Sequence, residues 1–119
     1  MQFAVRRGAV HGRPALSVRG ELDVATAPRL AEAVVSELAA GPRSLVLDLT
    51  GTTFMDSSGA RELVRAARRA ADAGTAIEVV CPRENTAVRL VVDLLELHLL
   101  VPVVERAGLG DGGVGGAGS

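Results

Sequence analysis

The chain has 119 residues, which is enough for one domain with a hydrophobic core and too few for two ordinary domains. Its 13 basic side chains, all arginine, nearly balance 14 acidic ones, so no overall positive field is available to bind nucleic acid or an anionic membrane surface. Cys81 is the only cysteine, which excludes an internal disulfide and a cysteine-based metal cluster. No segment has the form of a signal peptide or a membrane-spanning helix. We therefore expect one cytoplasmic domain that recognises its partners through a local surface.

The first elements expected in the chain are two short strands. Residues 3–7 and 15–18 have strand-like composition, and glycine and proline residues interrupt the chain between them. We therefore expect an antiparallel hairpin with its turn at residues 11–14.

An amphipathic helix is expected after the hairpin. Thr26 and Pro28 are typical of a helix start, and Gly41 is typical of a helix end. Between these signals, apolar residues recur at helical spacing, as at Leu30 and Val34. One face of this helix should therefore pack on the core.

The second half of the chain alternates strands with helices. The apolar segment 44–50 is typical of a central parallel strand, because both of its faces are largely apolar. Helical and strand-like patterns then predict a helix over 60–74, a strand over 75–81, a helix over 84–95 and a last strand over 100–104. The sequence thus predicts an α/β fold: a small, mostly parallel β-sheet with an N-terminal antiparallel hairpin, flanked by amphipathic helices.

The C-terminal end of the chain has a different composition. Its glycine density makes ordering costly, and it offers little apolar surface to bury. We therefore divide the chain into a domain over residues 1–105 and a flexible glycine-rich tail over residues 106–119.

The sequence DSSG stands where a strand gives way to a helix. We expect Asp56, Ser57 and Ser58 in a loop at the carboxyl end of a parallel strand, where α/β proteins commonly meet ligands and partners. One such side chain can cap the helix, which is worth about 1 kcal/mol. Three occur here, followed by Gly59, which permits close approach of another backbone. Because a helix N-terminus stabilises negative charge, the site suits a phosphorylated serine as well as a cap.

Other residues give no pattern typical of an enzyme or a metal site. The nucleophile elbow of hydrolases needs glycine two residues before the serine, and Asp56 precedes Ser58 there. His11 falls in the hairpin turn, and His98, between two leucines, is expected to be partly buried. Neither histidine has the spacing of a metal-ligand pair, and the chain has no phosphate-binding glycine loop. We expect no catalytic residues, no metal and no cofactor.

Two further groups of side chains receive structural interpretations. Phe54 and Met55 are expected to be core residues at the end of a strand. Four arginines follow on the next helix and are expected to form a solvated face that could contact an acidic partner: Arg61, Arg65, Arg68 and Arg69.

Two segments of the chain resemble the anti-sigma factor antagonist family, whose fold is the STAS domain. They are GELDVATAPRL, residues 20–30, and LVLDLTGTTFMDSSGARELV, residues 45–64. The resemblance extends over roughly residues 3–104, and DSSG combined with the upstream GELD is more specific than either alone. At Glu96 the chain departs from many relatives, which have glycine at the end of the third helix.

The resemblance implies a binding protein that is switched by phosphorylation. In that family the unphosphorylated protein binds an anti-sigma factor, which is also a serine kinase, and so releases a sigma factor. The kinase phosphorylates the second serine of the motif, here Ser58, and a serine phosphatase removes the phosphate. The partner-binding residues that the resemblance implies are Asp23, Thr26, Asp56, Ser57, Ser58 and Gly59.

A second function remains open from the sequence. The chain could be a STAS module that binds a nucleotide or another small ligand, or a subunit of a larger regulatory or transport assembly. Its short length and the intact acceptor serine favour the phosphorylation switch.

Overall fold

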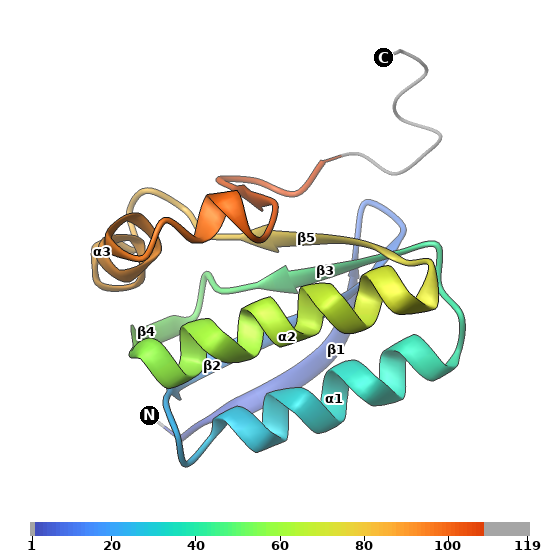
Figure 1. Cartoon of the computed structure of the whole chain (residues 1–119), viewed down its shortest axis with the longest axis horizontal. Coiled ribbons are helices and arrows are strands. Elements are labelled where there is room, and N and C mark those ends of the chain that lie inside the picture. The colour runs from blue at the N-terminus through green and yellow to red at the C-terminus, as the bar shows by residue number, and fades with distance from the viewer. Residues whose placement is uncertain (1, 109–119) are drawn as a thin grey trace.

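In the computed structural model, which describes residues 2–108, a six-stranded sheet packs against helices (Figure 1). In chain order the elements are β1 (Ala4–Val10), β2 (Arg13–Leu22), α1 (Ala27–Ala39), β3 (Ser44–Asp48), β4 (Thr52–Met55), α2 (Ser57–Ala73), β5 (Ala76–Val80), α3 (Thr86–Leu94), the short 3-10 helix η1 (Leu97–Leu99) and β6 (Val103–Val104).

The sheet has the expected topology. β1 and β2 form an antiparallel hairpin, and β3, β5 and β6 follow β2 as parallel neighbours in the order β1-β2-β3-β5-β6. β4 lies off this path and pairs in parallel with the end of β2. The predicted α/β fold, mostly parallel after an N-terminal hairpin, is confirmed.

The sequence predicted a strand end at Phe54 and Met55, but not that β4 is separate from β3; β4 brings the end of β2 beside the start of α2. β2 pairs with β3 up to Ser17 and with β4 from Gly20 onward, and its register against β4 shifts between Gly20 and Glu21. Gly20 has a φ of 93°, and its N–H donates to the Gly51 carbonyl at 3.1 Å. As a result, Leu22 pairs with Met55.

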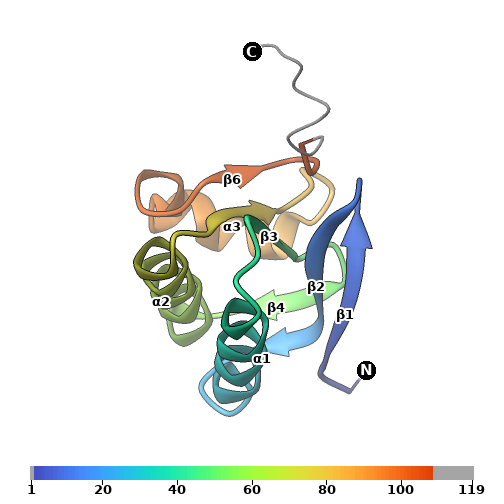
Figure 2. The same ribbon diagram turned by 90° about the vertical axis from the view of Figure 1, so that its right-hand side faces the viewer.

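The helices cover one face of the sheet, as Figure 2 shows for α1 and α2. The main core lies on this face, where leucines and valines of β2 and β3 meet the apolar faces of all three α-helices. The face pattern follows from strand alternation, because Leu45 and Leu47 belong to this core while Val46 points to the other side. On that second face, Ala15, Val46 and Val80 form a smaller cluster.

Three expectations about single residues and boundaries were wrong. Helix α2 begins at Ser57, so Ser57 and Ser58 lie in its first turn instead of in a loop. Phe54 is 47% exposed because it alternates with Met55, and only Met55 faces the core. His98 is exposed, since η1 buries Leu97 instead.

The C-terminal part of the described chain adds β6 to the sheet, beside β5, and packs on the second face. Glu96 has a φ of 51°, a left-handed conformation that glycine adopts more easily. Ala107 packs on the second-face cluster, and the Gly108 N–H donates to the Glu78 carboxylate at 2.8 Å. The rest of the expected tail, residues 109–119, lies outside the described residues.

Candidate functional site

Asp56 provides the cap at the junction of β4 and α2. Its carboxylate accepts a hydrogen bond from the Gly59 N–H at 3.0 Å. The hydroxyls of Ser57 and Ser58 make no hydrogen bond to any residue between 2 and 108. Ser57 is exposed and Ser58 is half-buried. Because the cap does not use them, both hydroxyls are free for another role.

Gly59 allows α2 to begin directly against the end of β2. A Cβ atom at this position would lie 2.5 Å from the Leu22 carbonyl oxygen, which is closer than packed atoms approach. The same carbonyl accepts a hydrogen bond from the Asp56 N–H at 3.3 Å. The serines are therefore held next to the residues that follow Leu22.

The turn after β2 is held by its own side chains. The Asp23 carboxylate accepts hydrogen bonds from the backbone N–H groups of Ala25 at 2.9 Å and Thr26 at 3.1 Å. The Thr26 hydroxyl accepts from the Asp23 N–H at 2.9 Å and donates to the Glu21 carbonyl at 2.7 Å. These bonds order the turn before α1, and both side chains remain half-buried at the surface.

The two turns lie side by side because their strands pair. Leu22 and Met55 are partners in the parallel ladder, and Asp23 and Asp56 are the residues that follow them. All six residues implied by the resemblance, Asp23, Thr26, Asp56, Ser57, Ser58 and Gly59, thus come together at one end of the sheet. Within this group, Gly59 is buried and acts through backbone position.

A groove between α1 and α2 extends from Ser58. Its volume is about 380 Å³. Apolar residues line it on the α1 side, and charged residues line it on the α2 side: Val24, Ala27, Pro28, Ala31, Ser58, Arg61, Glu62, Arg65 and Arg69. Val24 is 73% exposed, so the apolar wall is open to solvent near the serine.

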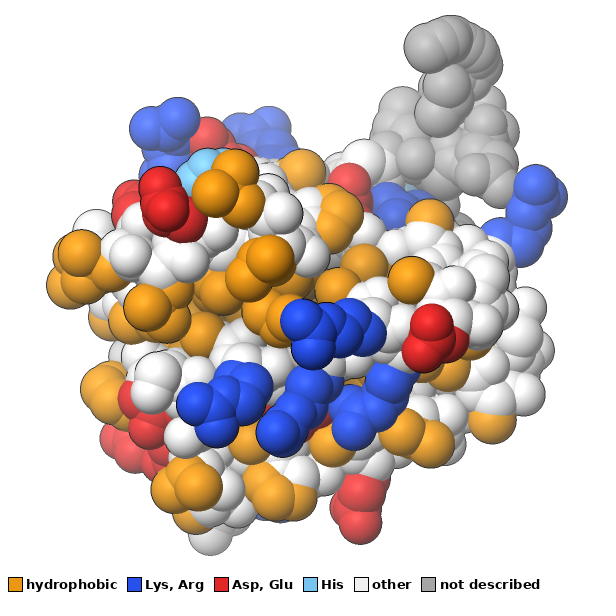
Figure 3. Space-filling model, in the orientation of Figure 1, with side chains coloured by type: hydrophobic (Ala, Val, Ile, Leu, Met, Phe, Trp, Pro, Cys, Tyr) orange, Lys and Arg blue, Asp and Glu red, His pale blue; other side chains and the backbone are white. Residues whose placement is uncertain are grey.

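The arginines of α2 are not equivalent, although the sequence suggested one solvated face. Glu62 is only 3% exposed, and its carboxylate pairs with Arg69 at 2.9 Å and with Arg65 at 3.7 Å. Arg61 and Arg68 form no ion pair with any described residue. Figure 3 shows basic side chains gathered over α2, with hydrophobic surface beside them. The groove was missed from the sequence because it depends on how α1 and α2 pack.

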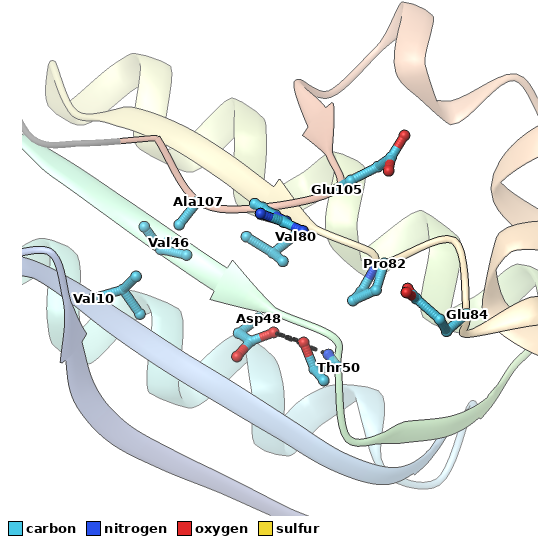
Figure 4. Close-up of a pocket in the computed structure, with 10 residues that line it drawn as sticks. Val10, Val46, Asp48, Thr50, Val80, Pro82, Glu84, Glu105 and Ala107 are labelled. Carbon is cyan, nitrogen blue, oxygen red and sulfur yellow. Dashed lines mark hydrogen bonds between the residues drawn. The ribbon is translucent and has the colours of Figure 1, made fainter. Parts of the chain in front are cut away.

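A second pocket lies on the other face of the sheet (Figure 4). It has a volume of about 320 Å³. Its floor is apolar and includes Val10, Val46 and Val80. Its rim carries three carboxylates and one arginine: Asp48, Glu84, Glu105 and Arg106. The Asp48 carboxylate accepts hydrogen bonds from the N–H and hydroxyl of Thr50 at 2.9 and 2.5 Å.

Between residues 2 and 108, no three histidine, cysteine, aspartate or glutamate side chains are grouped so that they could hold a metal ion. In the same part of the chain, no helix combines the length and apolar character needed to cross a membrane.

Comparison with protein families identifies the fold. The STAS domain family matches residues 6–107, which include both turns and the groove. The chain belongs to the STAS domain family. No curated protein matches the sequence of this STAS domain.

Solved structures of anti-sigma factor antagonists resemble this STAS domain over most of its length. An anti-sigma factor antagonist from Mycobacterium paratuberculosis is 28% identical, with a TM-score of 0.78, and the match covers 88% of this chain and 87% of that one. A putative anti-sigma factor antagonist from Thermotoga maritima is 23% identical, with a TM-score of 0.71, covering 83% and 84%. The anti-sigma factor antagonist SpoIIAA in its unphosphorylated form is 15% identical, with a TM-score of 0.60, covering 89% and 90%. The last two likenesses concern the fold alone.

Proposed function

We propose that this STAS domain is an anti-sigma factor antagonist. In its unphosphorylated form it binds an anti-sigma factor serine kinase in the cytoplasm and thereby releases a sigma factor. Phosphorylation of Ser58 ends this binding, and a serine phosphatase restores it. The observation that carries the proposal is the half-buried Ser58 hydroxyl, which has no hydrogen bond to any described residue and lies beside the turn that contains Asp23.

The domain acts as the substrate of the kinase and supplies no catalytic group. The Ser58 hydroxyl oxygen forms the new bond to the γ-phosphorus of ATP, the bond to ADP breaks, and the hydroxyl proton passes to a base of the kinase. Similarity to the mycobacterial antagonist over 88% of the chain supports this class of partner.

Phosphate at Ser58 is expected to weaken the complex through charge and bulk. A phosphoserine carries about −1.5 to −2 charges at neutral pH. In the free domain this charge stays hydrated, whereas in a complex it must be desolvated near Asp23 and Asp56. The contact surface that we assign consists of Asp23, Thr26, Asp56, Ser57 and Ser58, positioned by Gly59.

Phosphorylation by the candidate kinase tests the acceptor. A candidate anti-sigma factor serine kinase would be incubated with the full chain and ATP, and intact masses would be measured. We expect one phosphate on the wild type and on Ser57→Ala, and none on Ser58→Ala. Ser57→Ala is the matched control because it removes the neighbouring hydroxyl from the same helix turn. Phosphorylated Ser58→Ala protein would refute the assignment.

Partner titrations test the switch itself. Ser58→Ala should still bind the kinase, whereas Ser58→Asp should bind at least tenfold more weakly than the wild type, a loss of about 1.4 kcal/mol. Equal affinity of the wild type before and after phosphorylation would contradict the mechanism.

The pocket on the second face of the sheet favours one alternative function, a STAS module that binds a small ligand. Its apolar floor and its volume of about 320 Å³ suit a small molecule. The carboxylates of Asp48, Glu84 and Glu105 at its rim would repel the phosphates of a nucleotide. Equilibrium dialysis of the chain alone with ATP and GTP would decide the nucleotide case, and tight binding would favour this alternative.

A further inference from the structure

Among residues 2–108, Arg61 has no ion-pair partner, and it lies one helical turn after Ser58. Both side chains line the groove between α1 and α2, and Arg61 is exposed. Residues three apart on a helix are neighbours, with Cβ atoms typically about 5–6 Å apart. The long arginine side chain can therefore reach a group attached to the Ser58 oxygen.

The other arginines of α2 are less well placed to meet such a group. Arg65 and Arg69 also line the groove, but both pair with the buried carboxylate of Glu62. Arg68 forms no ion pair with a described residue, yet it does not line the groove. Arg61 alone among the four combines a place beside Ser58 with an unoccupied guanidinium in the described structure.

We propose that Arg61 binds the phosphoryl group of phosphorylated Ser58. This inference rests on the proposed function, because it assumes that Ser58 receives phosphate. A guanidinium presents a planar fork of N–H donors that matches two phosphate oxygens, and such charge-assisted hydrogen bonds are stronger than neutral ones.

The charges around Ser58 direct the phosphate toward the groove. Asp56 lies two residues before Ser58, and Asp23 lies in the neighbouring turn, so acids occupy the side of the serine that faces the strand ends. On the groove side are Arg61, Arg65 and Glu62, and the charge of Glu62 is already balanced by its arginine partners. Repulsion by the aspartates and attraction by Arg61 act in the same direction.

The contact gives phosphorylation a second effect on the surface. Phosphate bound to Arg61 covers the end of the groove and removes a free positive charge from its wall. A partner that meets Ser58 therefore encounters both a new anion and a groove whose nearest cation is occupied.

A ³¹P NMR titration tests the contact without any kinase. Phosphoserine is incorporated at position 58 during translation, in the wild type and in Arg61→Gln and Arg68→Gln full-length proteins. We expect the second pKa of the phosphate to be lower in the wild type than in Arg61→Gln by about 0.3 pH unit or more, because a nearby cation favours the dianion. Arg68→Gln, an exposed arginine of the same helix outside the groove, should match the wild type. The difference should shrink in 1 M NaCl.

Two results would overturn the proposal. One is the same phosphate pKa in the wild type and in Arg61→Gln. The other is a larger increase of this pKa in an Arg65→Gln protein than in Arg61→Gln, which would assign the phosphate to Arg65. Because phosphoserine is encoded, a kinase that fails to modify Ser58 would refute only the proposed function, and an unchanged pKa would refute only the role of Arg61.

Discussion

At the start of α2, Asp56 provides the helix cap and Ser58 does not. Asp56 accepts the hydrogen bond of the cap, so the helix does not need the Ser58 hydroxyl. A modification of Ser58 therefore leaves the cap intact. Phosphorylation of Ser58, as proposed, would therefore change the charge at the helix start without removing the cap.

Gly59 lets the start of α2 pack directly against Leu22 at the end of β2. Alanine at this position should therefore destabilise the domain. A Cβ atom there would lie 2.5 Å from the Leu22 carbonyl oxygen and 2.9 Å from side-chain carbons of Leu22 and Met55. We expect Gly59→Ala to lower the free energy of unfolding by about 1–3 kcal/mol, measured by urea denaturation, because the backbone oxygen cannot move aside easily.

Gly8→Ala is the matched control for this substitution. Gly8 lies in β1, where a Cβ atom would meet nothing within 4 Å. Its effect should stay within about 0.5 kcal/mol, as for other surface positions. A Gly59→Ala protein as stable as the Gly8→Ala protein would show that α2 does not need this close approach.

At the scale of the element, α2 uses its arginines in two ways. Arg69 and Arg65 neutralise the buried Glu62, whereas Arg61 and Arg68 are not needed for this among the described residues. The helix thus presents a positive surface beside Ser58 while it keeps a carboxylate inside.

Arg69→Ala should therefore cost more stability than Arg68→Ala. Loss of Arg69 removes the 2.9 Å hydrogen bond to Glu62 and leaves this buried carboxylate with Arg65 at 3.7 Å. We expect a decrease of about 1–2 kcal/mol in the free energy of unfolding for Arg69→Ala and almost none for Arg68→Ala. Equal denaturation midpoints of the two variants would show that the Glu62 pair contributes nothing.

Elements with a clear period could be predicted from the sequence, and those set by distant partners could not. The apolar segment 44–50 correctly indicated β3, and the Thr26, Pro28 and Gly41 signals correctly indicated α1. β4 has only the sequence TTFM, and it is a strand because β2 changes partners at Gly20. The start of α2 was placed three residues late because Ser57, Ser58 and Gly59 are poor helix formers inside a helix.

The candidate site was also predictable only in part, because some of its features depend on contacts between segments that are distant in the sequence. The DSSG and GELD motifs indicated Ser58 and Asp23, and strand pairing brings these segments together. The groove and the distinction between Arg61 and Arg65 depend on the packing of α1 against α2 and on the burial of Glu62. The amino-acid pattern alone carries no measure of these contacts.

At the scale of the whole molecule, the sheet separates two surfaces. Ser58 and its groove belong to the side covered by α1 and α2, and the second pocket lies on the opposite face. Between them is the main core, whose close-packed side chains do not deform continuously. A change at Ser58 should therefore act at its own surface.

Phosphorylation of Ser58 should accordingly leave the fold unchanged. The hydroxyl makes no hydrogen bond to a described residue, the cap depends on Asp56, and the helix N-terminus offsets part of the added charge. In amide NMR spectra we expect shifts confined to residues near 22–28 and 56–62, and a melting temperature within about 4 °C of the unmodified protein, which for a domain of this size is below about 1 kcal/mol. Protein incubated with kinase but without ATP is the control. Amide shifts spread across β3 and β5 would show instead that the phosphate acts by rearranging the core.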